Sequence, residues 1–562
     1  MHANESSCRC ARMTTTREFT ILHVMDSLSD KKGWEEKVLD DAISNKWKEE
    51  LLAIPGKDIS QPMIDYIIEE LRYRAQIFKN TGRFMVCDGG VIKSDVAVPS
   101  DLKLSLRAEV KCLEDVPERY KDYHPGSNGQ VIDLVHPSLF PLIYGKSKVL
   151  TGRTITTKDC ISSIGLGDVI PIIEESLGDA FSTRFQWLPC DVEFKNEGND
   201  VEITSYINNL HPQKHQKLYK IIENIVSRSI PLWNFTLSRA SIAPDDDYQR
   251  INYGTEVKCH YPEELRPAIA KDEGEDEYEE RVFDWEQDNV IVEQPEPEPF
   301  LLTPDVHNCL QGEGHFYSKA GVKSLESLID LRRDYQHRGL QVIVKLATIE
   351  LTPEKPAYEG GSWHVEGQLN ERICATALYY FESTNITESR LAFRQRCDTS
   401  TAEEDIAYPQ NEFQFLNQVF GLDSEQPAIQ EVGSVSCAEG RLVTFPNNLQ
   451  HRVVPFSLAD PSKTGSRKIL ALFLVDPNIR VISTANVPPQ QKDWWAEELL
   501  KTGALGAFSR ELQDQIIENV DDFPISLDEA KNLREDLMDE RRTFVVNTND
   551  HYESFSFSLC EH

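Results

Sequence analysis

The sequence lacks the long apolar run that a membrane crossing requires. No stretch of its 562 residues approaches the ~20 consecutive apolar residues of a transmembrane helix. The first 17 residues are polar and contain no apolar run that could serve as the core of a secretory signal. These two absences predict an intracellular, cytoplasmic protein that is not embedded in a membrane.

Positive charge is also scarce. The chain has 59 Lys and Arg residues against 93 Asp and Glu residues, which gives a net charge of −34 at neutral pH. A surface this acidic repels the phosphates of nucleic acids and anionic membranes. We therefore expect neither nucleic acid nor membrane as a partner. A basic protein substrate stays compatible with this charge.

Closely spaced cysteines are rare among the twelve that the chain contains. Cys8 and Cys10 form the one close pair, and no second pair follows at the spacing of a zinc ribbon. Scattered cysteines of this kind are typical of free thiols in a reducing compartment. The sequence therefore predicts neither a disulfide framework nor a cysteine-ligated zinc site.

The first half of the chain is rich in helical patterns. Apolar residues at helical spacing predict a helix over Trp34–Leu52, and Ser60 with Pro62 marks the start of a second one. A third helix is expected over 212–230, with one apolar face and Pro231 as its end.

Strand patterns dominate the second half. Apolar and β-branched runs predict strands over Leu340–Leu351, 373–381, 440–446 and 467–477. These strands are joined by turns rather than by regular helices, which favours an antiparallel double-sheet jelly roll. The predicted fold class is α+β, with a jelly-roll core, a helix-rich N-terminal part and C-terminal helices. The acid- and proline-rich segment between the halves is predicted to be a solvated connector. The expected regions are a disordered lead (1–18), a helix-rich region (19–262), an acidic linker (263–300), the jelly-roll core (301–485), and C-terminal helices with a tail (486–562).

A candidate metal site lies at the end of one of these strands. His364 and Glu366 are two residues apart, so in an extended chain they project from the same face. His451 follows the predicted strand 440–446 after a short turn. Two His residues and one carboxylate on one face of a metal are the ligand set of non-haem Fe(II) oxygenases.

A candidate anion-binding residue follows the second His. Arg467 stands at the start of an apolar strand, and its guanidinium can hold a carboxylate with two parallel hydrogen bonds. Arg452 and Lys468 are the competing cations. Each is adjacent to a candidate residue, so strand alternation directs its side chain to the opposite face.

The order His-x-Glu, His, Arg resembles the 2-oxoglutarate/Fe(II)-dependent dioxygenase superfamily. The sequence is most similar to a largely fungal family of uncharacterised proteins with that double-stranded β-helix core. The resemblance runs from about Leu134 to Trp495. The segments that carry it are Phe185–Pro189, Tyr206–Pro212 and Trp363–Gly367.

This resemblance implies an Fe(II)- and 2-oxoglutarate-dependent oxygenase that hydroxylates or otherwise oxidises a small molecule, such as a secondary metabolite. In this interpretation His364, Glu366 and His451 are the catalytic metal ligands, and Arg467 binds the co-substrate 2-oxoglutarate, with O2 as the oxidant. Two features depart from the usual pattern. The carboxylate is Glu where most of the superfamily uses Asp, and Arg467 lies further after His451 than usual.

Two other functions remain open at this stage. One is a non-catalytic jelly-roll scaffold that uses the acidic arm and the helices for protein contacts. The other is a metal-dependent, cupin-type enzyme that does not use 2-oxoglutarate. The complete ligand set argues against the scaffold, and Arg467 argues against the cupin-type enzyme.

Overall fold

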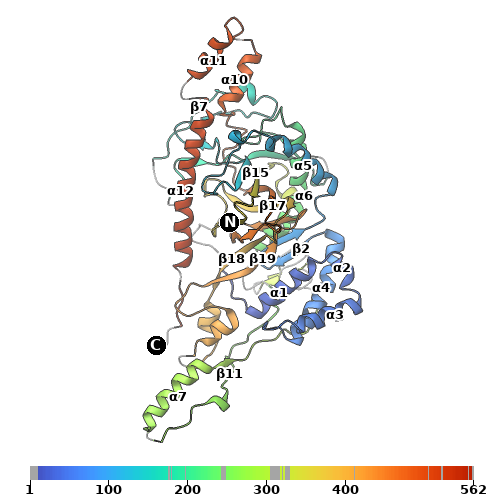
Figure 1. Cartoon of the computed structure of the whole chain (residues 1–562), viewed down its shortest axis with the longest axis vertical. Coiled ribbons are helices and arrows are strands. Elements are labelled where there is room, and N and C mark those ends of the chain that lie inside the picture. The colour runs from blue at the N-terminus through green and yellow to red at the C-terminus, as the bar shows by residue number, and fades with distance from the viewer. Residues whose placement is uncertain are drawn as a thin grey trace.

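A computed structural model of the whole chain combines helices with mostly antiparallel strands, so the fold is α+β (Figure 1). The structure describes residues 10–559 except 175–177, 179, 196–197, 242–247, 272, 304–309, 311–316, 319–320, 323–328, 410–411, 504, 521–522 and 555.

A nine-stranded sheet forms the centre of the body. Eight of its strands follow one another in the order β10, β9, β15, β23, β17, β20, β3 and β2, and β4 pairs with β15 beside β9. All of its strand pairs are antiparallel. The bounds are β2 Phe84–Cys87, β3 Val91–Ser94, β4 Val131–Val135, β9 Cys190–Phe194, β10 Val201–Ile203, β15 Leu340–Leu351, β17 Ile373–Thr384, β20 Leu442–Pro446 and β23 Gly465–Val475.

A second, smaller sheet packs on one face of the first. It contains β1 (Ala11–Arg12), β18 (Arg390–Asp398), β19 (Ile429–Ser436) and β21 (Gln450–Val453), and β18 pairs with the other three. Buried side chains fill the space between the two sheets, among them Ile343 and Phe473 from the large sheet and Phe393 and Val435 from the small one. These two facing layers form the interior in which the candidate site lies.

Helices cover the opposite face of the large sheet. Strand alternation directs Val342 and Val344 of β15 to that face, where they join one core cluster with α5 (Ser100–Glu114) and α6 (Gln216–Ala240). The prediction that Pro231 ends this third helix is wrong, since α6 continues nine residues beyond it. The proline removes one backbone hydrogen bond, but the turns after it bury Trp233 and Phe235, which offsets that loss.

The N-terminal region begins with four helices: α1 (Thr16–Ser29), α2 (Trp34–Lys37), α3 (Asp41–Leu52) and α4 (Gln61–Thr81). The single helix expected over 34–52 is divided in two, because Asp40 accepts hydrogen bonds from the amides of Ala42 and Ile43 and starts a new helix there. Ser60 caps α4 as predicted. Within the described part of the expected disordered lead, β1 pairs with β18 and α1 begins at Thr16.

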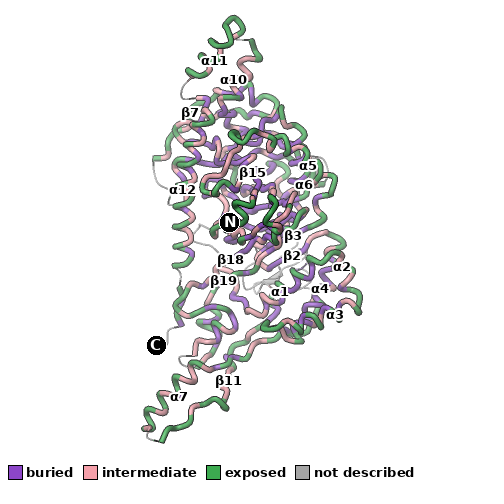
Figure 2. The backbone as a smooth tube through the Cα atoms, viewed as in Figure 1, coloured by how far each residue is buried: buried purple, intermediate pink, exposed green. Residues whose placement is uncertain are grey.

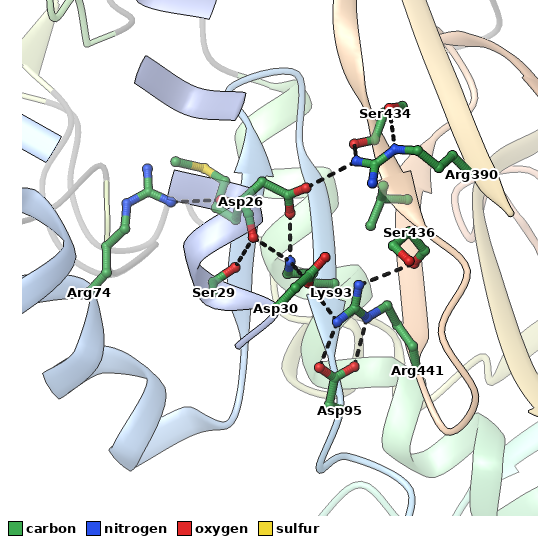
Figure 3. A network of polar contacts seen from close by, with 12 residues as sticks. Asp26, Ser29, Asp30, Arg74, Lys93, Asp95, Arg390, Ser434, Ser436 and Arg441 are labelled. Carbon is green, nitrogen blue, oxygen red and sulfur yellow. Dashed lines mark hydrogen bonds and ion pairs between the residues drawn. The ribbon is translucent and has the colours of Figure 1, made fainter. Parts of the chain in front are cut away.

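Buried charges fasten α1 to both sheets (Figure 3). Lys93 on β3 donates to Asp26 of α1 (2.6 Å) and to Asp30, the residue directly after α1 (2.5 Å). Arg441, just before β20, contacts Asp30 at 2.8 Å, and Arg390 on β18 lies 3.5 Å from Asp26. The N-terminal helices are therefore docked on the body through paired charges as well as apolar contacts.

The expected acidic linker contains a helix. Residues 275–289 form α7, which lies at one end of the molecule beside a two-stranded pairing of β11 (Cys259–His260) with β12 (Ile291–Val292) (Figure 1). The tube of Figure 2 is mostly green and pink along α7, which marks exposed and partly exposed residues. Val282 is the one buried residue of the helix. The segment has apolar residues at i,i+4 spacing, which is typical of a helix. Its eight acidic residues made it look like a solvated connector instead.

The C-terminal region is helical, with α10 (Lys492–Lys501), α11 (Arg510–Glu518) and the long α12 (Leu527–Glu553), which runs along the body (Figure 1). Ser526 caps α12 by accepting a hydrogen bond from the amide of Glu529. The short helix α9 (Leu331–Tyr335) precedes β15. A π-helical turn, Leu416–Phe420, is closed by Gly421.

Short elements complete the structure. The other two-stranded pairings are β5 (Leu142–Ile143) with β8 (Phe185–Gln186), β6 (Lys148–Val149) with β7 (Asp168–Val169), β13 (Tyr317–Ser318) with β14 (Gly321–Val322), and β16 (Ala357–Tyr358) with β22 (Phe456–Ser457). The remaining short helices are Glu118–Tyr120, Ile161–Ser163, Glu263–Leu265 and the π-helical Thr401–Asp405.

Candidate metal centre

Two distant segments bring His364 and His451 side by side. The segment before Gly367 forms an antiparallel bridge with β21, in which each His amide donates to the carbonyl of the other, at 3.2 and 3.0 Å. The two imidazole rings therefore project from one place, with centroids 4.4 Å apart. This pairing places two residues that are far apart in the sequence at the same edge of the interior.

Glu366 joins the two imidazoles. One ligand atom from each of His364, Glu366 and His451 lies within 4.8 Å of the others. A Glu366 carboxylate oxygen is 3.4 Å from Nε2 of His451, and the side chains of Glu366 and His451 are 15% and 5% exposed. The geometry therefore brings all three predicted ligands together in a largely buried position, while their role as ligands stays a prediction.

The protonation states suit a cation. Burial and the neighbouring His451 lower the pKa of His364 to about 4, so its ring is neutral at physiological pH. Burial alone would raise the pKa of Glu366, but the hydrogen bond from His451 and the charge of the imidazoles bring it down to about 2. A neutral imidazole and an ionised carboxylate are the forms in which these side chains bind metals.

The second nitrogen of His364 is also in the right state. Its Nδ1 lies 2.8 Å from the carbonyl oxygen of Ser362, which can only accept a hydrogen bond. The ring proton is therefore on Nδ1, and Nε2 is free to bind a metal. Nδ1 of His451 is buried and has no hydrogen-bond partner among the described residues; its ring packs against Phe445, 4.7 Å between centroids.

Asn447 holds the backbone of Glu366 in place. Its side-chain oxygen accepts from the Glu366 amide (2.8 Å), and its nitrogen donates to the carbonyls of Glu366 (2.9 Å) and Ile373 (3.1 Å). The residue is completely buried. In the sequence Asn447 belongs to the turn before His451, and nothing in that turn indicates which distant backbone it binds.

We expect Asn447→Ala to weaken metal binding by roughly 10–100-fold, the usual effect of removing a group that orients a ligand. The carboxylate would remain, but the backbone that aims it would lose two hydrogen bonds. Titration of the metal-free protein with Co2+ or Fe2+ measures the change. Asn385→Ala is the matched control, since Asn385 binds three carbonyls of another turn; unchanged affinity in Asn447→Ala would contradict a positioning role.

Arg467 is buried in the interior. It is 2% exposed, donates from Nη1 to the hydroxyl of Ser389, and lies against Phe456 and Tyr380, 5.1 and 5.6 Å from the ring centroids. Its Nε is buried without a hydrogen-bond partner among the described residues. A buried guanidinium with no carboxylate within ion-pair distance in the described chain is costly, and this favours an anionic ligand there.

The rival cations lie elsewhere. Arg452 stacks on Trp363 and faces Glu431, and Lys468 pairs with Glu114 and Glu382. Lys345 is a cation that the sequence analysis missed. It lies opposite Ala471 on β23, on the interior face, and its charge contributes to lowering the pKa values of His364 and Glu366. The sequence feature that indicates this interior cation is a single Lys at an interior-facing position of an otherwise apolar strand.

A second group of potential ligands contains His124, Asp133 and His136, whose ligand atoms also lie within 4.8 Å of one another. The protons are placed differently there. Nδ1 of His136 accepts a hydrogen bond from the amide of Ser138 at 3.1 Å, so the neutral ring carries its proton on Nε2, the atom that a metal would need. His124 directs Nδ1 to Asp133 at 2.8 Å. At His451, by contrast, Nδ1 has no hydrogen-bond partner among the described residues and can take the ring proton, so the group formed by His364, Glu366 and His451 is better suited to a metal.

His211 and His215, four residues apart at the start of α6, do not join either group. Nδ1 of His211 accepts from the amides of Gln213 and Lys214, and His215 lies 3.8 Å from Cys112, as expected for the start of a helix. His307 and His315 lie outside the described residues. None of the helices in the described ranges combines the length and apolar character that a bilayer crossing requires.

The molecule is thus an α+β protein with a buried His–Glu–His group between two facing sheets. The chain belongs to the family described as "Protein of unknown function (DUF4246)", which matches residues 61–498. Residues 2–50 match its companion, "Domain of unknown function DUF4246, N-terminal". No curated protein matches the chain.

Two solved structures have local similarity to the chain. One is IDO from Bacillus thuringiensis, with 12% identity, a TM-score of 0.13, and coverage of 25% of this chain and 47% of that one. The other is a selenomethionine-labelled Fe(II)/(alpha)ketoglutarate-dependent dioxygenase, TqaL, with 15% identity, a TM-score of 0.15, and coverage of 26% and 46%. The chain therefore spans less than half the length of either protein, and likenesses this slight assign no function.

Proposed function

We propose that this chain is an Fe(II)- and 2-oxoglutarate-dependent oxygenase that acts on a small molecule, with O2 as oxidant. The observation that carries the proposal is the convergence of His364, Glu366 and His451 between the two sheets. In this proposal the two facing sheets are a double-stranded β-helix, with β15, β23, β17 and β20 in one layer and β18, β19 and β21 in the other. The triad then lies inside the barrel, where water is excluded.

The donor set fits Fe(II). Two neutral imidazoles and one carboxylate leave other coordination positions open, as non-haem iron oxygenases require. The Ser362 carbonyl fixes the proton of His364 on Nδ1, and Asn447 aims Glu366, so both ligands are oriented before a metal binds. When bound there with 2-oxoglutarate, the iron supplies the oxidising chemistry, and the chain supplies orientation and exclusion of water.

Arg467 is the proposed partner of the 2-oxoglutarate carboxylate that lies away from the iron. A dicarboxylate that enters the interior buries one negative charge, which is costly unless a cation meets it. Arg467 is buried, keeps Nε free of partners in the described chain, and has Phe456 and Tyr380 to hold its guanidinium in place. Lys345, on a neighbouring strand of the same face, is the alternative anchor.

Arg467→Ala should raise the KM for 2-oxoglutarate by about 30-fold or more, since removing one partner of a buried charge pair costs roughly 2–5 kcal/mol. Metal binding should persist, because no ligand is touched. Arg467→Lys should recover part of the loss, because a point charge lacks the two parallel bonds of the guanidinium. Steady-state turnover of 2-oxoglutarate measures the change.

Arg452→Ala is the control in the same assay, since Arg452 is 40% exposed and pairs with Glu431; its KM should stay within about twofold of wild type. Lys345→Met separates the two interior cations. If Arg467→Ala keeps the wild-type KM while Lys345→Met raises it, Lys345 is the anchor and the assignment of Arg467 is wrong.

The proposal as a whole is tested on the purified chain. Loaded with Fe(II), it should release succinate from labelled 2-oxoglutarate, and a chelator should abolish this release. Bound iron without succinate would favour the cupin-type enzyme that does not use 2-oxoglutarate. If the chain neither binds iron nor releases succinate, the non-catalytic scaffold is the function that remains.

A further inference from the structure

The long C-terminal helix α12 runs along the body, beyond residues 61–498, which match the family (Figure 1). Its buried residues recur at helical spacing, so one face of the helix packs on the body. They are Ala530, Arg534, Leu537, Phe544 and Tyr552. The proposed oxygenase reaction uses no residue of this helix, yet polar contacts of the same face lead to the segments that carry the candidate metal ligands.

Asn549, in the last two turns of α12, connects the two segments that contain the candidate histidine ligands. Its Nδ2 donates to the carbonyl oxygen of Trp363 at 3.0 Å, and Trp363 is the residue before His364. Its Oδ1 accepts from Nε2 of Gln450 at 2.9 Å, and Gln450 is the residue before His451. One side chain of α12 therefore bonds to the direct neighbours of both imidazoles.

Arg394 on β18 fixes the orientation of these amides. Its Nη2 lies 3.4 Å from Oδ1 of Asn549, and its Nε donates to Oε1 of Gln450 at 2.7 Å. Turning either amide over would place two donors together, so Asn549 presents its oxygen to Gln450 and its nitrogen to the Trp363 carbonyl. Gln450 and Arg394 are buried, and the guanidinium of Arg394 also lies 5.0 Å from the ring centroid of Trp363. The contact with α12 is therefore a defined, largely buried hydrogen-bond network.

A second contact of α12 holds the loop that follows Glu366. Nη2 of Arg541 donates to the carboxylate of Glu371 at 2.7 Å, and the guanidinium stacks on Trp187, 3.8 Å from the ring centroid. The buried Glu371 carboxylate also accepts from the amides of Gln368 (2.6 Å) and Trp187 (2.7 Å). The helix therefore contacts the chain both before and after the His-x-Glu pair.

We propose that Asn549 is a positioning residue of the metal centre, and that docking of α12 and binding of the metal favour each other. A metal requires His364, Glu366 and His451 at fixed relative positions, and groups around the ligands set those positions. Coupling between two sites is reciprocal, so if docked α12 raises the metal affinity, bound metal stabilises the docked helix by the same factor. The inference rests on the metal site of the proposed function, but not on Arg467 or the co-substrate.

The first test is titration of the metal-free full chain with Co2+, because the visible absorption of this ion depends on the geometry of its ligands. Asn549→Ala should weaken Co2+ binding by about tenfold, the lower end of the effect of removing a group that orients a ligand, and should change the absorption bands of the bound ion. Asn547→Ala is the matched control, since Asn547 is an exposed asparagine two residues earlier on the same helix. It should show the affinity and the spectrum of the wild type, whereas a general loss of stability would leave the bands of the folded protein unchanged.

The second test needs no substitution in α12. Hydrogen exchange of the wild-type chain, measured by mass spectrometry, should slow in residues 541–553 by about tenfold when Co2+ is bound, since the coupling acts equally in both directions. In His451→Ala, which lacks one ligand, the same concentration of Co2+ should leave the exchange of these residues unchanged.

Two results would overturn the inference while the proposed function stands. One is an Asn549→Ala variant with the Co2+ affinity and spectrum of the wild type. The other is exchange in α12 that Co2+ does not slow, although His451→Ala shows that the ion binds at the candidate centre. If His451→Ala instead binds Co2+ as tightly as the wild type, the metal site is wrong, and the proposed function fails together with this inference.

Discussion

His451→Ala is expected to lose bound iron and to lower turnover of 2-oxoglutarate on the order of a thousandfold or more. A bound metal contributes several kcal/mol of transition-state stabilisation, and each ~1.4 kcal/mol is tenfold in rate. His451 is the most buried of the three candidate ligands and contacts both of the others, the Glu366 carboxylate at 3.4 Å and the ring of His364 at 4.4 Å between centroids. Replacing His451 with Ala therefore removes one candidate metal ligand and also the contact that holds the Glu366 carboxylate in place.

Iron per chain, measured by elemental analysis, and succinate release are the two readouts. His211→Ala is the matched control, because His211 is equally buried and also lies beside an aromatic ring, Trp494 at 4.7 Å, but belongs to neither ligand group. It should keep its iron and its turnover. Thermal unfolding of both variants shows whether a loss comes from the fold.

Glu366→Gln gives a second and milder test at the same centre. The amide keeps the shape of the side chain but removes the negative charge that neutralises part of the metal's charge. We expect a clear loss of iron affinity with an unchanged fold. If His451→Ala and Glu366→Gln both retain iron at the level of the wild type, the metal lies elsewhere, and the group around Asp133 becomes the next candidate.

The shared direction of His364 and Glu366 could be predicted because its signal is local, whereas His451 lies in a distant segment and was added to them from the family pattern. His364 and Glu366 are two apart in an extended segment, and β15 begins and ends at the residues that the sequence indicated. Strand alternation also sends Lys468 to the far face, toward Glu114, while Arg467 stays in the interior. Where strand alternation determines the face of the sheet on which a side chain lies, the sequence is sufficient to predict that face.

The residues that support the site could not be predicted, because their partners are distant in the sequence. Asn447 binds a backbone 81 residues away. Lys345 approaches the triad only because the chain folds β15 against β23 and the segment before Gly367 against β21. The wrong prediction of where α6 ends has the same origin. Local sequence predicts that the helix ends at Pro231, but the burial of Trp233 and Phe235 in the tertiary structure stabilises the turns beyond it.

A buried ionic cluster surrounds Arg250, away from the candidate metal centre. Arg250 has no exposed side-chain surface and contacts Glu70 of α4 at 3.0 Å, Asp88 at 2.7 Å and Glu18 of α1 at 3.4 Å. Burial would lower the pKa of Arg250, but these carboxylates raise it well above its usual value. One guanidinium thus joins α1, α4 and the turn between β2 and β3.

Arg250→Met should destabilise the protein by about 3–5 kcal/mol at neutral pH, the cost of removing one partner from a buried charge pair. The wild type gains stability from Glu70 and Asp88, because Arg250 and its neighbours lower the pKa values of these two carboxyls despite burial. That gain is present above the unfolded carboxyl pKa of about 4 and is lost as pH falls through the folded pKa values. In the variant the uncompensated carboxyls bind protons more readily, so the difference from wild type should shrink toward acidic pH.

Denaturant unfolding of both proteins at neutral pH and near pH 4.5 measures this difference. Arg266→Met is the control, since it removes an Arg that is 39% exposed and pairs only with surface carboxylates, and such pairs contribute about 0–1 kcal/mol. A hydrophobic residue can replace a whole buried ionic group without loss, but Met at 250 leaves three carboxylates behind. If Arg250→Met unfolds at the same denaturant concentration as wild type at neutral pH, those carboxylates are already neutral or reach water, and Arg250 does not hold the N-terminal helices on the sheet.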